Sequence, residues 1–350
     1  MYDLVAPIFI VGVGRSGTTL LRSLLSAHSR VAIAPETHYM KLANRRGDLA
    51  RGRPVDFEDF WRRFVATGRF ADLGISEPKV LAGLRPLRQP DHRSIFGLLL
   101  ALYAGRWSKP RAGEKSPSHV DYIGELLRWF PEARVIAMQR DPRAAAASKL
   151  TVDWAVHAPR PSLRQGIVAN RRQYHLVQTA ARWARVHEVV LPPWQHDDRV
   201  RTVRYEDLVA DPVPVLRALC GFIGEDYEDA MLRTRDAARD PAPDRNGGPS
   251  LRGAAAHYER ARQPVNTASL NRWQQRLTTA EITTIEAICH RSMAEAGYPL
   301  LTPAADRNRF ETMARRHLRG LKAAEWELDL RRRLGRPARF VERLVGRSRA

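Results

Sequence analysis

The stretch FIVGVGRSGTTLL, from Phe9 to Leu21, constrains the fold of this chain more than any other. An apolar run ends in glycines, and a hydroxyl-rich, apolar segment follows; this is the pattern of a buried strand, a phosphate-binding loop and a helix. Gly12 and Gly17 have the spacing of the loop pattern G-x-x-x-x-G-K-[ST], but Thr18 stands in place of the lysine. The stretch therefore predicts an α/β fold with an anion site where the first helix begins.

Strand and helix patterns alternate along the rest of the chain. Four stretches predict strands: Pro7–Val13 and Arg134–Gln139, which are expected to be buried, the short Arg30–Glu36, and Arg199–Leu208. The segment from Arg45 to Ser108 is predicted to be helical and irregular, and a helix is expected after Asp141, a plausible N-cap, with Pro142 in its first position. Strands separated by helices predict a P-loop-like, mostly parallel central sheet flanked by helices.

Charge and composition narrow the class of partner. The 350 residues carry a formal net charge of +20, which favours anionic partners. The arginines are spread over the whole chain without a recognition-helix, zinc-finger or RNA-binding signature, so we expect no nucleic-acid partner. Their abundance, with that of alanine, indicates a GC-rich bacterial genome.

The sequence also bears on the cellular compartment. Cys220 and Cys289 lie far apart and lack metal-ligand spacing, so free thiols in a reducing compartment are expected. The first residues show no signal-peptide pattern, and no run approaches the ~18 apolar residues of a membrane span. These features predict a cytoplasmic protein.

A glycine loop without its lysine suits a particular ligand. In nucleoside triphosphatases, the lysine bridges the β- and γ-phosphates and the adjacent hydroxyl holds magnesium. A ligand with one phosphate in the loop needs the lysine less, because backbone amides and the hydroxyls of Ser16, Thr18 and Thr19 can hold it. Arg15 would then face the reacting group. Taken alone, the loop is also compatible with a simple tight turn.

A second motif, RVIAMQRDPRAAAASKL, places Arg140 at the end of a predicted strand and Ser148 two helical turns later. This pair suits a second, separate phosphate. On this motif alone, a surface arginine and a helix serine without function would explain the pattern better.

Together, these motifs resemble those of the sulfotransferases that use 3′-phosphoadenosine 5′-phosphosulfate (PAPS). GVGRSGTTLL resembles the family's 5′-phosphosulfate loop, RDPRAAAAS its 3′-phosphate motif, and VRYEDLVADP, with Tyr205, a stretch near the nucleotide. The resemblance is closest to the branch of tyrosylprotein sulfotransferases and bacterial enzymes. That branch shares three more segments: APETH, GEKSP and QPVNTASLNRW, which contain Glu36, Lys115 and Arg272.

The resemblance implies an O-sulfotransferase. The acceptor hydroxyl attacks sulfur in line and adenosine 3′,5′-bisphosphate leaves, with Glu36 as the base and His38 in reserve. Lys115 and Arg15 would stabilise the charge that grows on the leaving phosphate. Lys115, one of six lysines by count, is expected in a tight turn. Arg272 stands where relatives carry a nucleotide-binding lysine. No metal is required, and no carboxylate pair has metal-ligand spacing.

Two positions depart from the tyrosylprotein enzymes. Ala261 stands near the place of a serine that assists at the reaction centre, and Val152 near that of an additional basic residue. Both departures put the corresponding roles in doubt.

The acceptor is less constrained. Residues 37–112 should form much of its pocket, and the aromatic stretches FEDFWRRFVATGRF and IFGLLLALYAGRW favour a small-molecule or lipid-like alcohol, although core-facing helices explain them equally well. Protein-tyrosine sulfation, a P-loop kinase or phosphotransferase, and a nucleotide-binding module without activity remain alternatives.

We expect a sulfotransferase domain over residues 1–302 and a basic helical extension over 303–350. Apolar residues from Phe310 to Leu330 recur at roughly helical spacing between arginines. This stripe would pack on the domain's own core or on a second copy in a homodimer, or lie on an anionic membrane.

Overall fold

The computed structural model describes residues 4, 6–44, 49, 54–151, 171–233 and 265–303, together with 309, 312, 315, 316, 318 and 319. The chain forms two compact units. The first comprises Met1–Arg140 and Val189–Ser269, and the second comprises Asp141–Glu188 and Leu270–Ala350. Val152, Ala261 and almost all of the predicted extension 303–350 lie outside the described residues.

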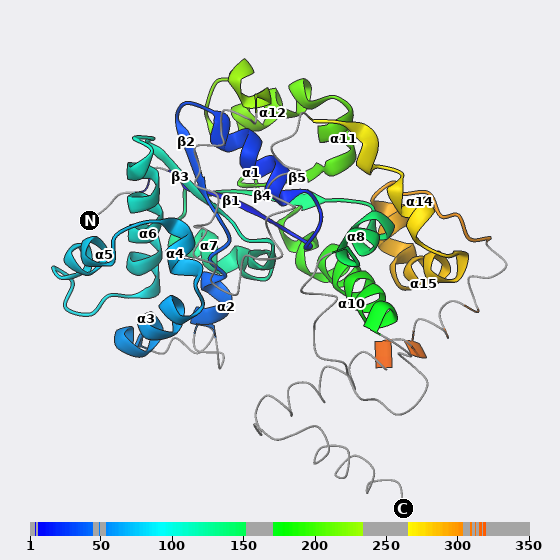
Figure 1. The fold of residues 1–350 in the computed structure, drawn as a ribbon, viewed down its shortest axis with the longest axis horizontal. Coiled ribbons are helices and arrows are strands. Elements are labelled where there is room, and N and C mark those ends of the chain that lie inside the picture. Colours follow the sequence, from blue (N-terminus) through cyan, green and yellow to red (C-terminus); the bar gives the residue numbers. More distant parts are fainter. Residues whose placement is uncertain are drawn as a thin grey trace, which may run out of the picture. The chain divides into compact units, whose positions relative to one another are not determined.

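The first unit is built on a parallel sheet of five strands (Figure 1). The strands are β1 (Ile8–Gly12), β2 (Val31–Ala34), β3 (Arg111–Lys115), β4 (Arg134–Gln139) and β5 (Val200–Arg204), in the order β2-β3-β1-β4-β5. Every residue of β1, β2 and β3 is buried. Burial on both faces explains why β1 and β2 read as continuous apolar runs. The predicted α/β fold with a parallel central sheet is confirmed.

Strand β3 was not predicted, because Arg-Ala-Gly-Glu-Lys has no apolar run. Its backbone nevertheless pairs with β1 and β2, and a Cβ at Gly113 would lie 2.3 Å from the carbonyl oxygen of Ile8. Only glycine fits there. The interpretation of Lys115 as part of a tight turn was therefore wrong, since it ends a buried strand.

The predicted strand Arg199–Leu208 is also shorter in the structure. It ends at Arg204, and Tyr205 begins helix α11 (Tyr205–Ala210). The strand's carboxyl end thus delivers Tyr205 to the edge where the glycine loop lies.

Helices cover the sheet of the first unit, with α1 and α12 above and α7 below in the view of Figure 1. Helix α1 packs against β1 and β2, and α6 packs against β2 and β3. Besides α11, the α-helices are α1 (Thr18–Ala27), α2 (Tyr39–Ala43), α3 (Phe57–Ala66), α4 (Arg69–Leu73), α5 (Glu77–Leu84), α6 (His92–Arg106), α7 (Ile123–Trp129) and α12 (Pro212–Ile223). Short 3-10 turns are η1 (Pro117–Tyr122), η3 (Pro192–Trp194), η4 (Asp229–Leu232) and η6 (Thr267–Ser269).

The second unit is helical, with α8 (Pro142–Lys149), α10 (Arg171–Arg185), α14 (Arg272–Arg276) and α15 (Thr279–Glu295). Helices α8, α10 and α15 pack on one another. The predicted start of α8 is confirmed, because the Asp141 side chain accepts a hydrogen bond from the Arg143 amide and Pro142 takes the first position. The buried Arg143 guanidinium also donates to Glu286, 2.6 Å away. The π-helix η2 (Val186–Val190) contains the point in the sequence where the chain passes from this unit back to the first.

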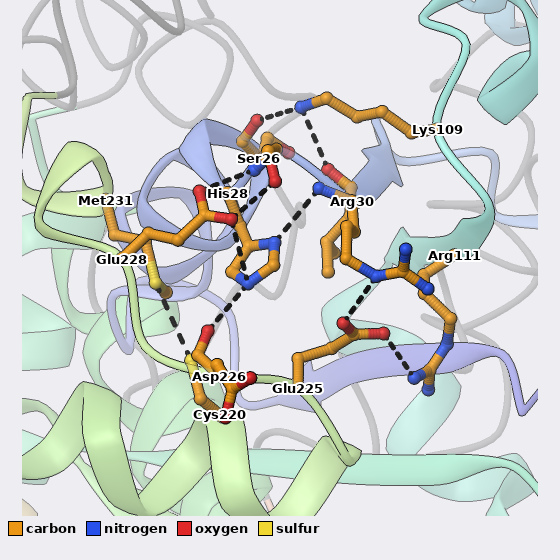
Figure 2. Close-up of polar contacts among 12 residues, drawn as sticks. Ser26, His28, Arg30, Lys109, Arg111, Cys220, Glu225, Asp226, Glu228 and Met231 are labelled. Carbon is orange, nitrogen blue, oxygen red and sulfur yellow. Dashed lines mark hydrogen bonds and ion pairs between the residues drawn. The ribbon is translucent and has the colours of Figure 1, made fainter.

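A polar network ties the amino edge of the sheet to the segment after α12 (Figure 2). The Glu225 carboxylate accepts hydrogen bonds from Arg30 and from Arg111, the first residue of β3, each at 2.8 Å. The buried His28 ring contacts the Asp226 carbonyl oxygen at 2.8 Å. Because Arg111 and Lys115 are opposite ends of one strand, this network stabilises the sheet at the edge away from the glycine loop.

Candidate functional site

The sequence-predicted residues of the first unit lie at one edge of the sheet. Each follows or ends a different strand at its carboxyl end, where ligands bind in open parallel sheets. In strand order they are Glu36 after β2, Lys115 at the end of β3, the loop 13–17 after β1, Arg140 after β4 and Tyr205 after β5. The fold thus brings together five segments that are far apart in the sequence.

The loop between β1 and α1 depends on two glycines. Gly12 has φ +141°, and a Cβ there would lie 2.5 Å from the Met138 carbonyl oxygen. Gly17, the N-cap of α1, has φ +90°, and a Cβ there would lie 2.2 Å from the Tyr205 ring. The loop therefore packs directly against β4 and Tyr205, and Arg15, with φ 75°, makes the left-handed turn between them.

Several features of this loop fit a bound phosphate. Helix α1 has no acidic residue in its first turn, so its N-terminal dipole favours an anion. The Ser16 hydroxyl is fully buried and makes no hydrogen bond with any described residue, which is costly unless a ligand satisfies it. Thr18 is buried and Thr19 half-buried beside it. The predicted hydroxyls thus line the start of the helix.

Arg140 is a buried cation that joins three segments at this edge. Its guanidinium donates to the carbonyl oxygens of Arg15 and Ser269, each at 3.1 Å, and stacks on the Tyr205 ring, 4.2 Å from the centroid. The Tyr205 hydroxyl is 2.6 Å from Oγ of Ser269. Sequence reasoning missed Ser269, although it lies within the quoted QPVNTASLNRW block.

Glu36 and Lys115, both predicted to be catalytic, form an ion pair. Nζ of Lys115 lies 2.5 Å from Oε1 of Glu36, and Nε2 of His38 lies 3.4 Å from Oε2. Burial would raise the pKa of Glu36, but Lys115 and His38 outweigh it and hold this pKa at about 2. Burial lowers the pKa of His38 despite the nearby carboxylate, so its ring is neutral at pH 7. Glu36 is therefore an ionised but weakly basic carboxylate.

Glu114, which sequence reasoning missed, anchors the backbone on both sides of this pair. Its buried carboxylate accepts hydrogen bonds from the amide and hydroxyl of Thr37, at 2.9 and 2.6 Å, and from the Ser116 hydroxyl at 2.5 Å. The His119 ring lies 2.8 Å from its other oxygen. Burial opposes ionisation of Glu114, but His119 and these donors lower its pKa below the usual value. The available sequence signal was its place in the GEKSP segment, directly before Lys115.

The charge of Glu36 also affects the pKa of a second acidic group, Asp72. Burial raises the pKa of Asp72 on α4 to about 6, although Arg69 lies 3.5 Å away, and the charge of Glu36 adds to this increase. Arg69 in turn helps to lower the pKa of Glu36. Helix α4 thus belongs to the electrostatic surroundings of the predicted base.

The two remaining predicted residues belong to the second unit. Ser148 is half-buried near the end of α8, and Arg272 is exposed at the start of α14. The pairing of Ser148 with Arg140 and the contact of Arg272 with a nucleotide both remain predictions.

The aromatic stretches considered for the acceptor pocket form part of the core. Tyr39 stacks on Phe96 at 4.5 Å between ring centroids and meets the edge of Phe60 at 5.0 Å. Phe60, Phe64 and Phe96 are at most 2% exposed. For these residues the core-facing interpretation holds, so they give no reason to prefer a lipid-like or aromatic acceptor.

The described part of the chain contains no group of three or more His, Cys, Asp or Glu side chains that could hold a metal ion. Within the same residues, every helix is too short or too polar to cross a membrane.

Comparison with known proteins decides the family. A family model described as Sulfotransferase family matches residues 7–229, from just before β1 to the first residue of η4. The chain belongs to this family. The match covers Glu36, Lys115, the glycine loop, Arg140, Ser148 and Tyr205, so the resemblance inferred from the motifs is confirmed.

Individual relatives agree with this assignment. The chain is 26% identical over 271 residues to protein-tyrosine sulfotransferase 2 of Gallus gallus and 25% identical over 268 residues to protein-tyrosine sulfotransferase 1 of Danio rerio, covering 76% of this chain in both cases. It spans less than two thirds of their length, 62% and 65%. The sulfotransferase domain of the Synechococcus PCC 7002 olefin synthase is similar in fold, with a TM-score of 0.53 and 20% identity, covering 85% of this chain and 96% of that one.

Proposed function

We propose that this protein transfers a sulfuryl group from PAPS to a hydroxyl acceptor. The observation that carries the proposal is the placement of a carboxylate and a buried lysine, Glu36 and Lys115, beside a lysine-free glycine loop at one edge of the sheet. Family membership supports it. A sulfate ester and adenosine 3′,5′-bisphosphate are the products.

The two anionic groups of the nucleotide bind at two separate sites. Backbone amides of the loop, with the hydroxyls of Ser16, Thr18 and Thr19, hold the 5′-phosphosulfate at the N-terminus of α1. Arg140 and Ser148 hold the 3′-phosphate, and Arg272 adds a further cation. Tyr205 supports both sites, because its ring packs under Gly17 and under the Arg140 guanidinium.

Glu36 and the two cations carry the chemistry. Glu36 takes the proton of the acceptor hydroxyl as its oxygen attacks sulfur. The bond between sulfur and the bridging oxygen breaks, and the electron pair leaves on the 5′-phosphate. Lys115 and Arg15 stabilise the negative charge that grows there. No step in this scheme requires a divalent metal.

The acceptor class has two candidates. A small-molecule alcohol, lipid-like or otherwise, is the first, and a protein tyrosine is the second. The second is supported by the names of the relatives, which are protein-tyrosine sulfotransferases.

Calorimetry separates the proposed function from its rivals. A sulfotransferase binds adenosine 3′,5′-bisphosphate much more tightly than Mg-ATP, whereas a P-loop kinase shows the reverse order. Transfer from labelled PAPS is then measured with alcohols and tyrosine peptides, with and without excess chelator. Labelled ester that forms in chelator supports the scheme. Activity that is lost in chelator and restored by magnesium contradicts it.

A further inference from the structure

The ion pair between Glu36 and Lys115 is the dominant contact of both side chains. The Lys115 side chain is 1% exposed, and among the described residues Glu36 is its partner for hydrogen bonding and ion pairing. Glu36 is 26% exposed and also contacts His38. A buried ammonium without a counterion is strongly disfavoured, so charged Lys115 is strongly stabilised by pairing with an anion.

The backbone that carries this pair is held in place. Glu114 binds Thr37, next to Glu36, and Ser116, next to Lys115. The Ser116 amide also donates to the Ile10 carbonyl oxygen of β1 at 3.2 Å. Any change of partner must therefore come from rotation of the two side chains and not from movement of the strands.

The location of Lys115 offers its ammonium a second anion. In the register of β3 with β1, Lys115 lies opposite Ile10, two residues before the strand ends at Gly12 and the loop begins. A phosphosulfate in that loop presents several oxygen charges at the same edge. One ammonium cannot be the full counterion of Glu36 and of the phosphosulfate at once.

Pairing with Lys115 also suppresses the chemistry expected of Glu36. A base is most effective when its pKa is near the working pH, and the ion pair with Lys115, helped by His38 and Arg69, lowers the pKa of Glu36 to about 2. Without Lys115, His38 and Arg69 would still lower the pKa of Glu36, but burial, which is the largest influence, raises it, so the carboxylate would be a stronger base.

We propose that the sulfuryl donor and Glu36 compete for Lys115. Donor binding draws the ammonium onto the 5′-phosphosulfate, and the released Glu36 carboxylate becomes the base that takes the acceptor proton. This inference rests on the proposed function. It makes the basicity of Glu36 depend on donor binding, so Glu36 activates the acceptor hydroxyl only when a sulfuryl donor is bound.

A double-mutant cycle on nucleotide affinity tests the competition. Glu36→Gln removes the competing charge, so it should bind adenosine 3′,5′-bisphosphate about tenfold or more tightly than wild type. Simple repulsion between Glu36 and the nucleotide would also give some gain. The Lys115→Met background distinguishes the two causes, since Glu36→Gln should give a much smaller gain there, the part due to repulsion alone. An equal gain in both backgrounds overturns the proposal.

A measurement on the wild-type protein covers the case in which a variant does not fold. Carboxyl ¹³C signals of labelled glutamate are followed between pH 4 and 7, with and without adenosine 3′,5′-bisphosphate, and Glu36→Gln serves only to assign the signal. The Glu36 signal should titrate in this range only with nucleotide bound. A flat signal with nucleotide bound overturns the competition.

The outcomes separate this inference from the proposed function. If nucleotide binds and sulfuryl transfer occurs, but neither the cycle nor the titration shows coupling, only the competition is wrong. If adenosine 3′,5′-bisphosphate does not bind and no ester forms, the proposed function itself is wrong.

Discussion

The Arg140 guanidinium stacks 4.2 Å above the ring of Tyr205. One residue follows β4 and the other begins α11 after β5, so two adjacent strands place a cation on an aromatic face. The same ring lies under Gly17 of the glycine loop. Tyr205 is therefore the common support of the two phosphate sites proposed here.

Arg140→Ala should discriminate between nucleotides. Loss of an arginine–phosphate contact is expected to cost about 2–4 kcal/mol for adenosine 3′,5′-bisphosphate. The variant also loses the contacts with the Arg15 and Ser269 backbone, which affect any ligand of the loop, so 5′-AMP should weaken far less but measurably. Titration calorimetry with both ligands checks this. An equal loss for both would show that the 3′-phosphate is placed wrongly.

Gly17→Ala should abolish nucleotide binding or destabilise the fold. The left-handed backbone and the 2.2 Å approach of the new Cβ to Tyr205 both oppose it. Gly14→Ala is the matched control in the same loop, because a Cβ there meets no atom within 4 Å. Melting temperature and bisphosphate affinity are measured for both variants. Similar behaviour of the two would contradict the described loop geometry.

Glu36→Gln should reduce turnover by about 10²-fold or more at saturating donor, because the amide cannot take the acceptor proton. Donor must be saturating, since the variant leaves Lys115 without a counterion until phosphosulfate binds. His38→Gln is the control and should retain most activity. If the glutamine variant is nearly as active as wild type and the His38 variant is not, the base is His38.

The ion pair also predicts how stability depends on pH. The folded pKa of Glu36, about 2, is below the ordinary 4.5, so its contribution is present above pH 4.5 and is lost as pH falls towards 2. Glu36→Gln lacks this contribution at every pH. The difference in unfolding free energy between wild type and variant should therefore shrink by up to about 3 kcal/mol between pH 5 and 2.

Urea unfolding across this pH range measures that difference. Glu295→Gln, at an exposed position at the end of α15, serves as the control. A Glu36 difference that changes with pH no more than that of the Glu295 control would contradict a strong pair with Lys115.

Glu225→Gln should destabilise the first unit by about 3 kcal/mol, because it breaks the buried ion pair with Arg111 and also the pair with the exposed Arg30 (Figure 2). Bisphosphate affinity measured below the melting transition should not change, because the network lies at the opposite edge of the sheet. Asp226→Asn is the control, since His28 contacts the backbone oxygen of that exposed residue. A large loss of affinity in Glu225→Gln would show that the two edges are coupled.

Local patterns predicted the elements whose signals lie within a few residues. The apolar run before Gly12, the glycine spacing and the hydroxyls after it predicted β1, the loop and α1. Asp141 and Pro142 predicted the start of α8 in the same way. Strand β3 escaped prediction because its burial arises from pairing with β1 and β2, not from its own polar composition.

The sequence by itself determined β1, the glycine loop, α1 and the start of α8, because glycine freedom, capping and apolar runs act locally. Only the tertiary structure decided which side chains are partners. Lys115 and Glu36 are 79 residues apart in the sequence, and they meet because β2 and β3 are neighbours in the sheet. The same packing places Ser269 on Tyr205, and Glu114 between Thr37 and Ser116. A buried charge takes whichever counterion the fold brings within reach, and that choice sets its basicity.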